Sequence, residues 1–450
     1  MGLSRSLSTG TSSLRAHQKK FDIIANNLAN ASTVGFKSNR VTFADQFSQT
    51  TSLGQKPDTS GDTTGGLNPV QFGLGVKVGA VQRNMDQGLI EVTGRDLDMA
   101  INGNGFFIYQ ADGQTKYSRA GAVVRDSQGY LVDAGTGSHL QGYNLSYDAT
   151  GKPIKDSNGN NVLERALSNL RIQPGFLSAP RQTTEIALNG NLNAQMQTGE
   201  IRTTSINVYD KTGAARELAI TFEKSANPNE FTITGSIEGN AIPLSATTVT
   251  FNQDGSINTP NNLTVAASDL NTALGGDLFD ATTPKDINVT LVDPDGNTFG
   301  GLTQYSSPSN ATIQSQNGFE AGELLNMQVS PRGEVVGTFT NGQSEVIAQV
   351  AIAKFTNPEG LITSGGNFFE ASPNAGNPNI GTAGETFPST SISGSALEQS
   401  NVDLTIEFTE MISTQRAFEA ASRTVTVGDQ MLADRKSTRS IRSNRTSGNS

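Results

Sequence analysis

Residues 397–432 read LEQSNVDLTIEFTEMISTQRAFEAASRTVTVGDQML, and their apolar residues recur with a period of seven. The repeating positions are Leu397, Leu404, Met411, Phe418, Val425 and Leu432. Such a repeat is typical of a helix with one apolar stripe that packs against another helix. It therefore predicts a long C-terminal helix that begins near Ser395 or Ser400.

A matching repeat stands near the other end of the chain, where we expect a helix from about Ser4 to Asn30. Its apolar positions are Leu7, Leu14, Phe21 and Leu28, with Leu3 and Ile24 on the adjacent seam position. Gly10 and His17 interrupt this seam, and small polar side chains fill most other positions. Two such helices would bury little apolar surface as an isolated pair. We therefore expect self-assembly elements that complete their core with other copies of the chain.

The composition between these helices favours a β-rich protein of several domains. The chain has 450 residues, of which 34% are apolar, 16% are charged and 48 are glycine. That mixture is typical of many short strands and turns. The chain has no apolar run near the roughly 18 residues of a membrane-spanning helix, so we expect no membrane insertion. The net charge of -10 argues against a nucleic-acid partner.

The order of these signals predicts a multidomain, mainly β chain whose two ends meet and whose middle forms the tip of the molecule. The N- and C-terminal helices are expected to pair as a coiled-coil-like inner domain, with β-rich middle and outer domains beyond it. The predicted parts are a helical assembly domain (1–32 plus 396–435), extended connecting arms (33–80 plus 362–395), a middle domain (81–145 plus 311–361), an outer domain (146–310) and a flexible basic tail (436–450).

The sequence lacks the common signs of catalysis. It has two histidines and no cysteine, which leaves too few of the usual zinc ligands. Neither a Walker motif nor a G-x-S-x-G nucleophile motif is present. We therefore expect a protein that is not an enzyme and has no cofactor or metal. Paired carboxylates of a glycosidase meet only in space, so that class stays open.

Three stretches are similar to the bacterial flagellar axial family of rod and hook proteins. The first is residues 26–37, NNLANASTVGFK, the second is residues 96–107, DLDMAINGNGFF, and the third comprises residues 397–404 and 411–419. The resemblance covers about residues 1–145 and 318–432. The positions that match the family signature are Asn26, Asn27, Leu28, Ala29, Asn30, Gly35, Phe36 and Lys37.

Within this family, the inserted residues 146–310 resemble the hook branch rather than the shorter rod proteins. The resemblance implies a structural subunit that self-assembles into a curved flexible tube, a universal joint that transmits torque from rod to filament. It also implies an extracellular protein, exported without a cleaved signal peptide. The implied partners are other copies of the chain, the distal rod protein, the hook-filament junction protein, the hook cap and the flagellar export apparatus.

Two other interpretations remain at this point. One is a distal rod protein with an inserted outer domain, which would form a straight tube. The other is a secreted β-rich carbohydrate-binding or hydrolytic protein with helical ends. The second needs aromatic residues and carboxylates clustered in one cleft. With no tryptophan, it would depend on 7 tyrosines and 21 phenylalanines.

Overall fold

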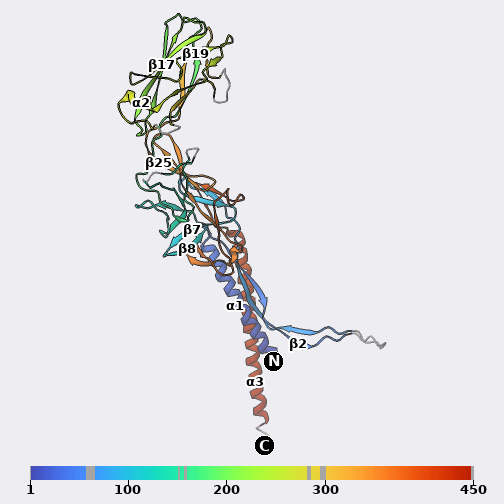
Figure 1. Ribbon diagram of the computed structural model, residues 1–450. Coiled ribbons are helices and arrows are strands. Elements are labelled where there is room, and N and C mark those ends of the chain that lie inside the picture. The colour runs from blue at the N-terminus through green and yellow to red at the C-terminus, as the bar shows by residue number, and fades with distance from the viewer. Residues whose placement is uncertain are drawn as a thin grey trace.

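The computed structural model describes residues 2–56, 66–149, 153–156, 160–280, 285–293 and 300–446. It is mainly β, with long helices at both ends that pack together (Figure 1). Figure 1 shows the helix pair in blue and red, the middle β domain beyond one end of it, and the outer β domain farthest from it. The expected fold class is confirmed.

The terminal helices are α1 (Gly2–Ala29) and α3 (Leu404–Thr446). Helix α3 has 43 residues against 28 in α1, and Figure 1 shows it extending beyond the start of α1. Its first turn is capped by Asp403, whose carboxylate accepts hydrogen bonds from the backbone N–H groups of Thr405 (2.8 Å) and Ile406 (3.2 Å).

Both ends of α3 differ from the expectation. The helix starts later than Ser400, because residues 396–398 pair as a strand instead, so Leu397 lies outside the helix. At the other end, the helix continues through Thr446, where a flexible tail was expected from residue 436. No glycine or proline interrupts residues 436–446, and extending an existing helix needs no new nucleus. Residues 447–450 lie outside the described part.

A long β hairpin follows α1. Strand β1 (Asn39–Asp45) pairs with β4 (Val76–Arg83), and farther out β2 (Ser48–Ser52) pairs with β3 (Val70–Gly73). Figure 1 shows the β2 end projecting away from the helix pair. This part of the expected arm is therefore paired strand, although residues 57–65 lie outside the described part.

The middle domain is a 14-stranded sheet built from both halves of the chain. Its strands are β7 (Phe106–Ala111), β8 (Gln114–Ser118), β9 (Val123–Arg125), β10 (Leu131–Asp133), β11 (His139–Asn144), β12 (Ser168–Asn169), β13 (Leu177–Ser178), β25 (Gly322–Val329), β26 (Glu334–Phe339), β27 (Ser344–Val350), β28 (Ile352–Lys354), β29 (Ile362–Gly365), β30 (Phe368–Glu370) and β31 (Asn379–Gly381). A 3-10 helix, η1 (Pro358–Gly360), follows β28.

Two strand pairs connect this sheet to the junction with the helices. Strand β6 (Met99–Asn102) pairs with β32 (Ser391–Gly394), and β5 (Ile90–Val92) pairs with β33 (Ala396–Glu398). Residues 362–395 therefore belong to the middle domain rather than to the expected connecting arm. Their aromatic side chains explain this, since Phe368 and Phe387 are buried in the core of the middle domain.

The outer domain has a core of its own, formed by two sheets and one helix. The five-stranded sheet contains β14 (Glu185–Asn191), β21 (Asn262–Val265), β22 (Ile287–Thr290), β23 (Leu302–Thr303) and β24 (Thr312–Gln316). The six-stranded sheet contains β15 (Ile201–Tyr209), β16 (Ala215–Lys224), β17 (Glu230–Ile237), β18 (Asn240–Ile242), β19 (Thr248–Phe251) and β20 (Ile257–Thr259). Helix α2 (Ala267–Leu274) packs beside them.

The border between middle and outer domains differs from the expected residues 146 and 310. Leu170 and Ile172 are buried in the middle core, and β12 and β13 pair within its sheet, so residues 168–178 contribute to the middle domain. Conversely, β24 pairs with β14 of the outer domain. The alternation of apolar and polar residues is the same in both domains, so periodicity alone could not place this border.

Candidate functional site

The candidate site is the α1–α3 pair together with the junction where both helices leave the middle domain. At the far end of the pair, Leu7 meets Gly428 and Gly10 meets Val425. Nearer the junction, Lys20 forms an ion pair with Glu410. Residue numbers rise along α1 as those of its partners fall along α3, so the helices are antiparallel. These contacts therefore define one register between the two helices from Leu7 to Lys20 of α1.

Two glycines let the helices approach closely. A Cβ added to Gly10 would lie 2.8 Å from Cγ2 of Val425, which is closer than two carbon atoms can approach. A Cβ on Gly428 would lie 3.1 Å from Cδ2 of Leu7. Each helix thus seats an apolar side chain of the other over a glycine. The sequence pattern treated Gly10 as an interruption of the seam, whereas the structure places it in the contact.

The predicted seam residues divide into four groups. Ile24 is buried, and Leu7, Leu14, Leu28, Met411, Val425 and Leu432 are partly buried. Phe21, Leu404 and Phe418 are exposed by 40%, 47% and 41%. Leu397 lies in strand β33, as described above, because it and its two neighbours pair with β5.

Helix α3 also exposes apolar residues that the seven-residue repeat did not single out. These are Ile406, Phe408, Ile412, Val427 and Met431. Leu404, Phe408 and Ile412 follow each other at a spacing of four, so they share one side of the helix. A repeat of seven residues identifies only one stripe of a helix. The sequence pattern therefore did not indicate this second apolar surface.

Asn27, a signature residue, joins three elements at the end of α1. It is 1% exposed, and its side chain exchanges two hydrogen bonds with the backbone of Asn39, at 2.8 and 3.0 Å. Its Nδ2 also donates to Oε1 of Glu407 on α3, at 2.9 Å. A buried amide with these partners holds α1, β1 and α3 together.

Lys37, another signature residue, joins the N-terminal segment to the strand before α3. Its Nζ lies 2.7 Å from Oε1 of Glu398, and the side chains are 1% and 0% exposed. Nε of Arg119 lies 3.0 Å from the other carboxylate oxygen of Glu398. Burial lowers the pKa of Lys37, while the carboxylate of Glu398 opposes that shift. Three distant segments thus meet in one buried ion cluster.

The remaining signature residues shape the turn between α1 and β1. Gly35 has φ +69°, and a Cβ there would lie 2.7 Å from the backbone nitrogen of Ala120. Its N–H donates to the carbonyl of Glu398 at 2.7 Å. The carbonyl of Phe36 accepts a bond from the N–H of Asn401. Asn30 bonds within the turn, whereas Asn26 and Ala29 are exposed.

Asn401, Arg119, Glu398 and Glu407 were not chosen from the sequence. The Oδ1 of Asn401 accepts a bond from the N–H of Ser38 at 2.8 Å, and its Nδ2 donates to the carbonyls of Asn84 and Asp86, both at 3.0 Å. Glu398 and Asn401 lie within residues 397–404, which resemble the flagellar axial family. That resemblance is the sequence feature that could have identified these two residues.

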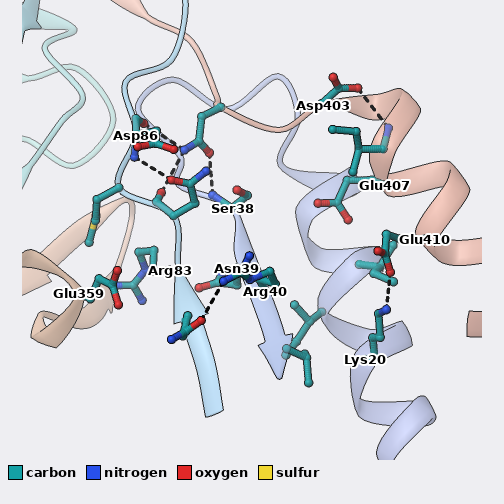
Figure 2. Close-up of a pocket in the computed structure, with 18 residues that line it drawn as sticks. Lys20, Ser38, Asn39, Arg40, Arg83, Asp86, Glu359, Asp403, Glu407 and Glu410 are labelled. Carbon is teal, nitrogen blue, oxygen red and sulfur yellow. Dashed lines mark hydrogen bonds and ion pairs between the residues drawn. The ribbon is translucent and has the colours of Figure 1, made fainter. Parts of the chain in front are cut away.

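Figure 2 shows a pocket of about 620 Å³ beside this junction, between both helices and the β1–β4 pair. Glu407 and Glu410 of α3 line it together with Lys20 and Arg40, and Lys20 forms its ion pair with Glu410 there. Burial chiefly raises the pKa of Glu407, and Glu410 adds to the shift, while the bond from Asn27 opposes it. The pocket is thus a mixed-charge surface.

Two further observations concern the described residues as a whole. None of their helices is both long and apolar enough to cross a membrane. No group of three or more His, Cys, Asp or Glu side chains among them is arranged to hold a metal ion.

Family models match three parts of the chain. Residues 7–37 match the flagella basal body rod protein model, and residues 393–434 match the C-terminal model of the flagellar basal body rod FlgEFG proteins. Residues 178–319 match the D2 domain of flagellar basal body protein FlaE. The first two matches contain the junction, and the third spans the outer domain.

Full-length relatives are similar across almost the whole chain. The flagellar hook protein FlgE of Treponema pallidum is 31% identical, covering 95% of this chain and 98% of that protein. The FlgE proteins of Borreliella burgdorferi and Escherichia coli are each 32% identical, over 96% and 94% of this chain and 98% of the relative. The crystal structure of Helicobacter pylori flagellar hook protein FlgE2 covers 69% of this chain and 100% of its own, with 14% identity and a TM-score of 0.47. At about 30% identity over nearly its full length, this chain belongs to the flagellar hook protein family.

Proposed function

We propose that this chain is the structural subunit of a bacterial flagellar hook. In this proposal, copies self-assemble into a curved flexible tube that acts as a universal joint and transmits torque from rod to filament. The role is mechanical, with no catalytic step and no cofactor. The observation that carries it is the antiparallel terminal helix pair, which leaves Leu404, Phe408, Ile412 and Phe418 of α3 exposed.

These exposed residues suit contacts with further copies of the chain. Helix α1 covers one side of α3, and the apolar residues on the neighbouring side are exposed to solvent in the single chain. Exposed apolar surface of this kind marks an interaction site. Identical subunits that meet through non-closing contacts form helical filaments. The terminal helices would form the inner layer of the tube.

The β hairpin supplies a second self-assembly surface. Its large apolar side chains are exposed, namely Phe47, Leu53, Leu67, Val70 and Phe72. An isolated two-stranded hairpin is marginal in water. The hairpin would therefore gain most of its stability by packing against neighbouring copies, which fits its projection from the body (Figure 1).

The proposal extends to the partners and the location of the subunit, supported by its membership of the hook protein family. The subunit would contact the distal rod protein at one end of the tube and the hook-filament junction protein at the other. The hook cap and the flagellar export apparatus would act on it during assembly. The protein would be extracellular, exported without a cleaved signal peptide.

The test is electron microscopy of the purified protein under conditions that drive polymerisation. A curved tube is the expected result. A straight tube would favour a distal rod protein with an inserted outer domain. Failure to form any ordered polymer would overturn the proposal, provided the β domains are folded by circular dichroism.

A further inference from the structure

The middle and outer domains are joined by a neck in which two segments of the chain pair. The backbone N–H of Arg181 donates to the carbonyl of Phe319, and the N–H of Phe319 donates back, both at 3.0 Å. Nearer the middle domain, Ser178 of β13 pairs with Gly322 of β25. The neck is therefore a short two-stranded ladder rather than two loose linkers.

A turn of the outer domain rests directly on this ladder. Gly213 ends the turn that follows β15. A Cβ added to it would lie 2.8 Å from Cβ of Pro180, and 3.3 Å from both the nitrogen of Ala321 and Cα of Glu320. The approach involves both strands of the ladder and mostly backbone atoms, which cannot rotate away as a long side chain can. A side chain at position 213 would therefore force the turn or the neck to shift.

The turn itself is a rigid part of the outer domain. The buried carboxylate of Asp210 accepts bonds from the N–H and hydroxyl of Thr212, at 2.8 and 2.6 Å, and from the N–H of Ala214 at 3.0 Å. The N–H of Lys211 donates to the carbonyl of Leu278, and its Nζ pairs with Asp277 at 2.6 Å. A movement of the outer domain therefore moves this turn with it.

The middle domain contacts the same ladder through another turn. Nδ2 of Asn341, in the turn between β26 and β27, donates to the carbonyl of Glu320 at 2.9 Å. A Cβ on Gly322 would lie 2.6 Å from the side-chain carbon of Asn341. Residues 320–322 thus touch a turn from each domain.

We propose that the seat of Gly213 on residues 180 and 320–321 is a stop that fixes the orientation of the outer domain relative to the middle domain. Gly213 has φ +85°, so glycine is also favoured there by the backbone alone. The contact adds a second requirement. The next step rests on the proposed function. In the tube, this orientation determines how the outer domains of neighbouring copies meet, and so contributes to the curvature.

A matched pair of variants separates the contact from the backbone requirement. Gly199, also in the outer domain, has the same φ of +85°, but a Cβ added to it would meet no atom within 4 Å. Both alanine variants therefore place a side chain at the same unfavourable φ, and only Gly213→Ala adds an atom that presses on the neck. Because the chain has no cysteine, Ser127→Cys and Ser268→Cys give two unique exposed sites for spin labels, one in each domain.

The measurement is the distance distribution between the two labels in the full-length monomer. The parent and Gly199→Ala should give the same narrow distribution, and Gly213→Ala should shift or broaden it. Asn341→Asp, which keeps an acceptor but loses the donor to Glu320, should also broaden it. Identical distributions for Gly213→Ala and Gly199→Ala would overturn the stop.

The same variants distinguish this inference from the proposed function. If the distribution shifts in the monomer and Gly213→Ala polymerises into tubes of altered curvature, both stand. If the distribution shifts but the parent protein forms no tube, the stop stands and the proposed function falls. Thermal unfolding of both alanine variants checks that the outer core remains folded.

Discussion

Val425 of α3 fills the space that a side chain on Gly10 of α1 would need, with its Cγ2 2.8 Å from the position of a Cβ there. The two residues are far apart in the sequence, and they mark a point where the backbone of α1 comes close to α3. The contact explains why a residue that weakens isolated helices is placed within one. It also makes the helix pair sensitive to side-chain volume at this position.

Gly10→Leu should weaken helix pairing and reduce tube formation. The added side chain must displace Val425, and overpacking of this kind typically costs about 1–3 kcal/mol. Sedimentation of polymer at increasing protein concentration measures the effect. Ser8→Leu, at an exposed position of α1, is the matched control and should polymerise better than Gly10→Leu. The opposite order would contradict the role of Gly10.

Phe418→Ala should impair polymerisation while leaving the melting of the β domains unchanged. The side chain is 41% exposed in the single chain, so its loss matters mainly where neighbouring copies cover it. A Phe→Ala change at a buried site costs about 3–5 kcal/mol. Glu419→Ala, one residue further on, should be nearly silent. Equal polymerisation by the parent and Phe418→Ala would show that this surface is not the assembly surface.

Glu398→Gln should destabilise the junction strongly. It leaves Lys37 and Arg119 buried without their counter-charge, and removing one partner of a buried ion pair typically costs about 3–5 kcal/mol. Chemical denaturation of the monomer measures the loss. Glu91→Gln, on the strand paired with β33, changes an exposed carboxylate and should cost less than about 0.5 kcal/mol. Similar losses in the two variants would contradict a buried cluster.

Glu407→Gln should stabilise helix pairing at neutral pH. Burial raises the pKa of Glu407 above its ordinary value, so folding favours the protonated carboxyl. Stability therefore falls as the pH rises from the unfolded-state pKa through the folded-state pKa. Glutamine keeps an acceptor for Asn27 and removes this dependence. Thermal unfolding across acidic to neutral pH should show a flatter profile for Glu407→Gln than for Glu419→Gln, and parallel profiles would refute the assignment.

Replacing residues 182–318 by an Asn-Gly turn should leave a folded middle domain. Arg181 and Phe319 exchange two backbone hydrogen bonds, which places their Cα atoms about 5.5 Å apart, a gap that a two-residue hairpin turn closes. Heteronuclear NMR spectra of the shortened protein test this. Removing residues 146–310 instead takes Leu170 and Ile172 out of the middle core, and should give a less stable protein.

Several features could be predicted because they depend on neighbouring residues. The period of seven placed α1 at residues 4–30, close to its observed Gly2–Ala29. The start of α3 was harder, because the apolar pattern runs through Leu397 without a break. Only the pairing of residues 396–398 with β5 ends the pattern there, and that partner lies far away in the sequence.

The sequence by itself determined the mainly β class, the two terminal helices and the family resemblance, since periodicity, composition and motifs are properties of short segments. Tertiary structure alone decided that Lys37 meets Glu398 across 361 residues, that Gly10 seats Val425, and where the outer domain begins. Each of these depends on contacts between segments that are far apart in the sequence, and no repeat or motif within one segment indicates them. The packing of the whole chain selects it, because only there are the buried charges paired and the apolar side chains covered.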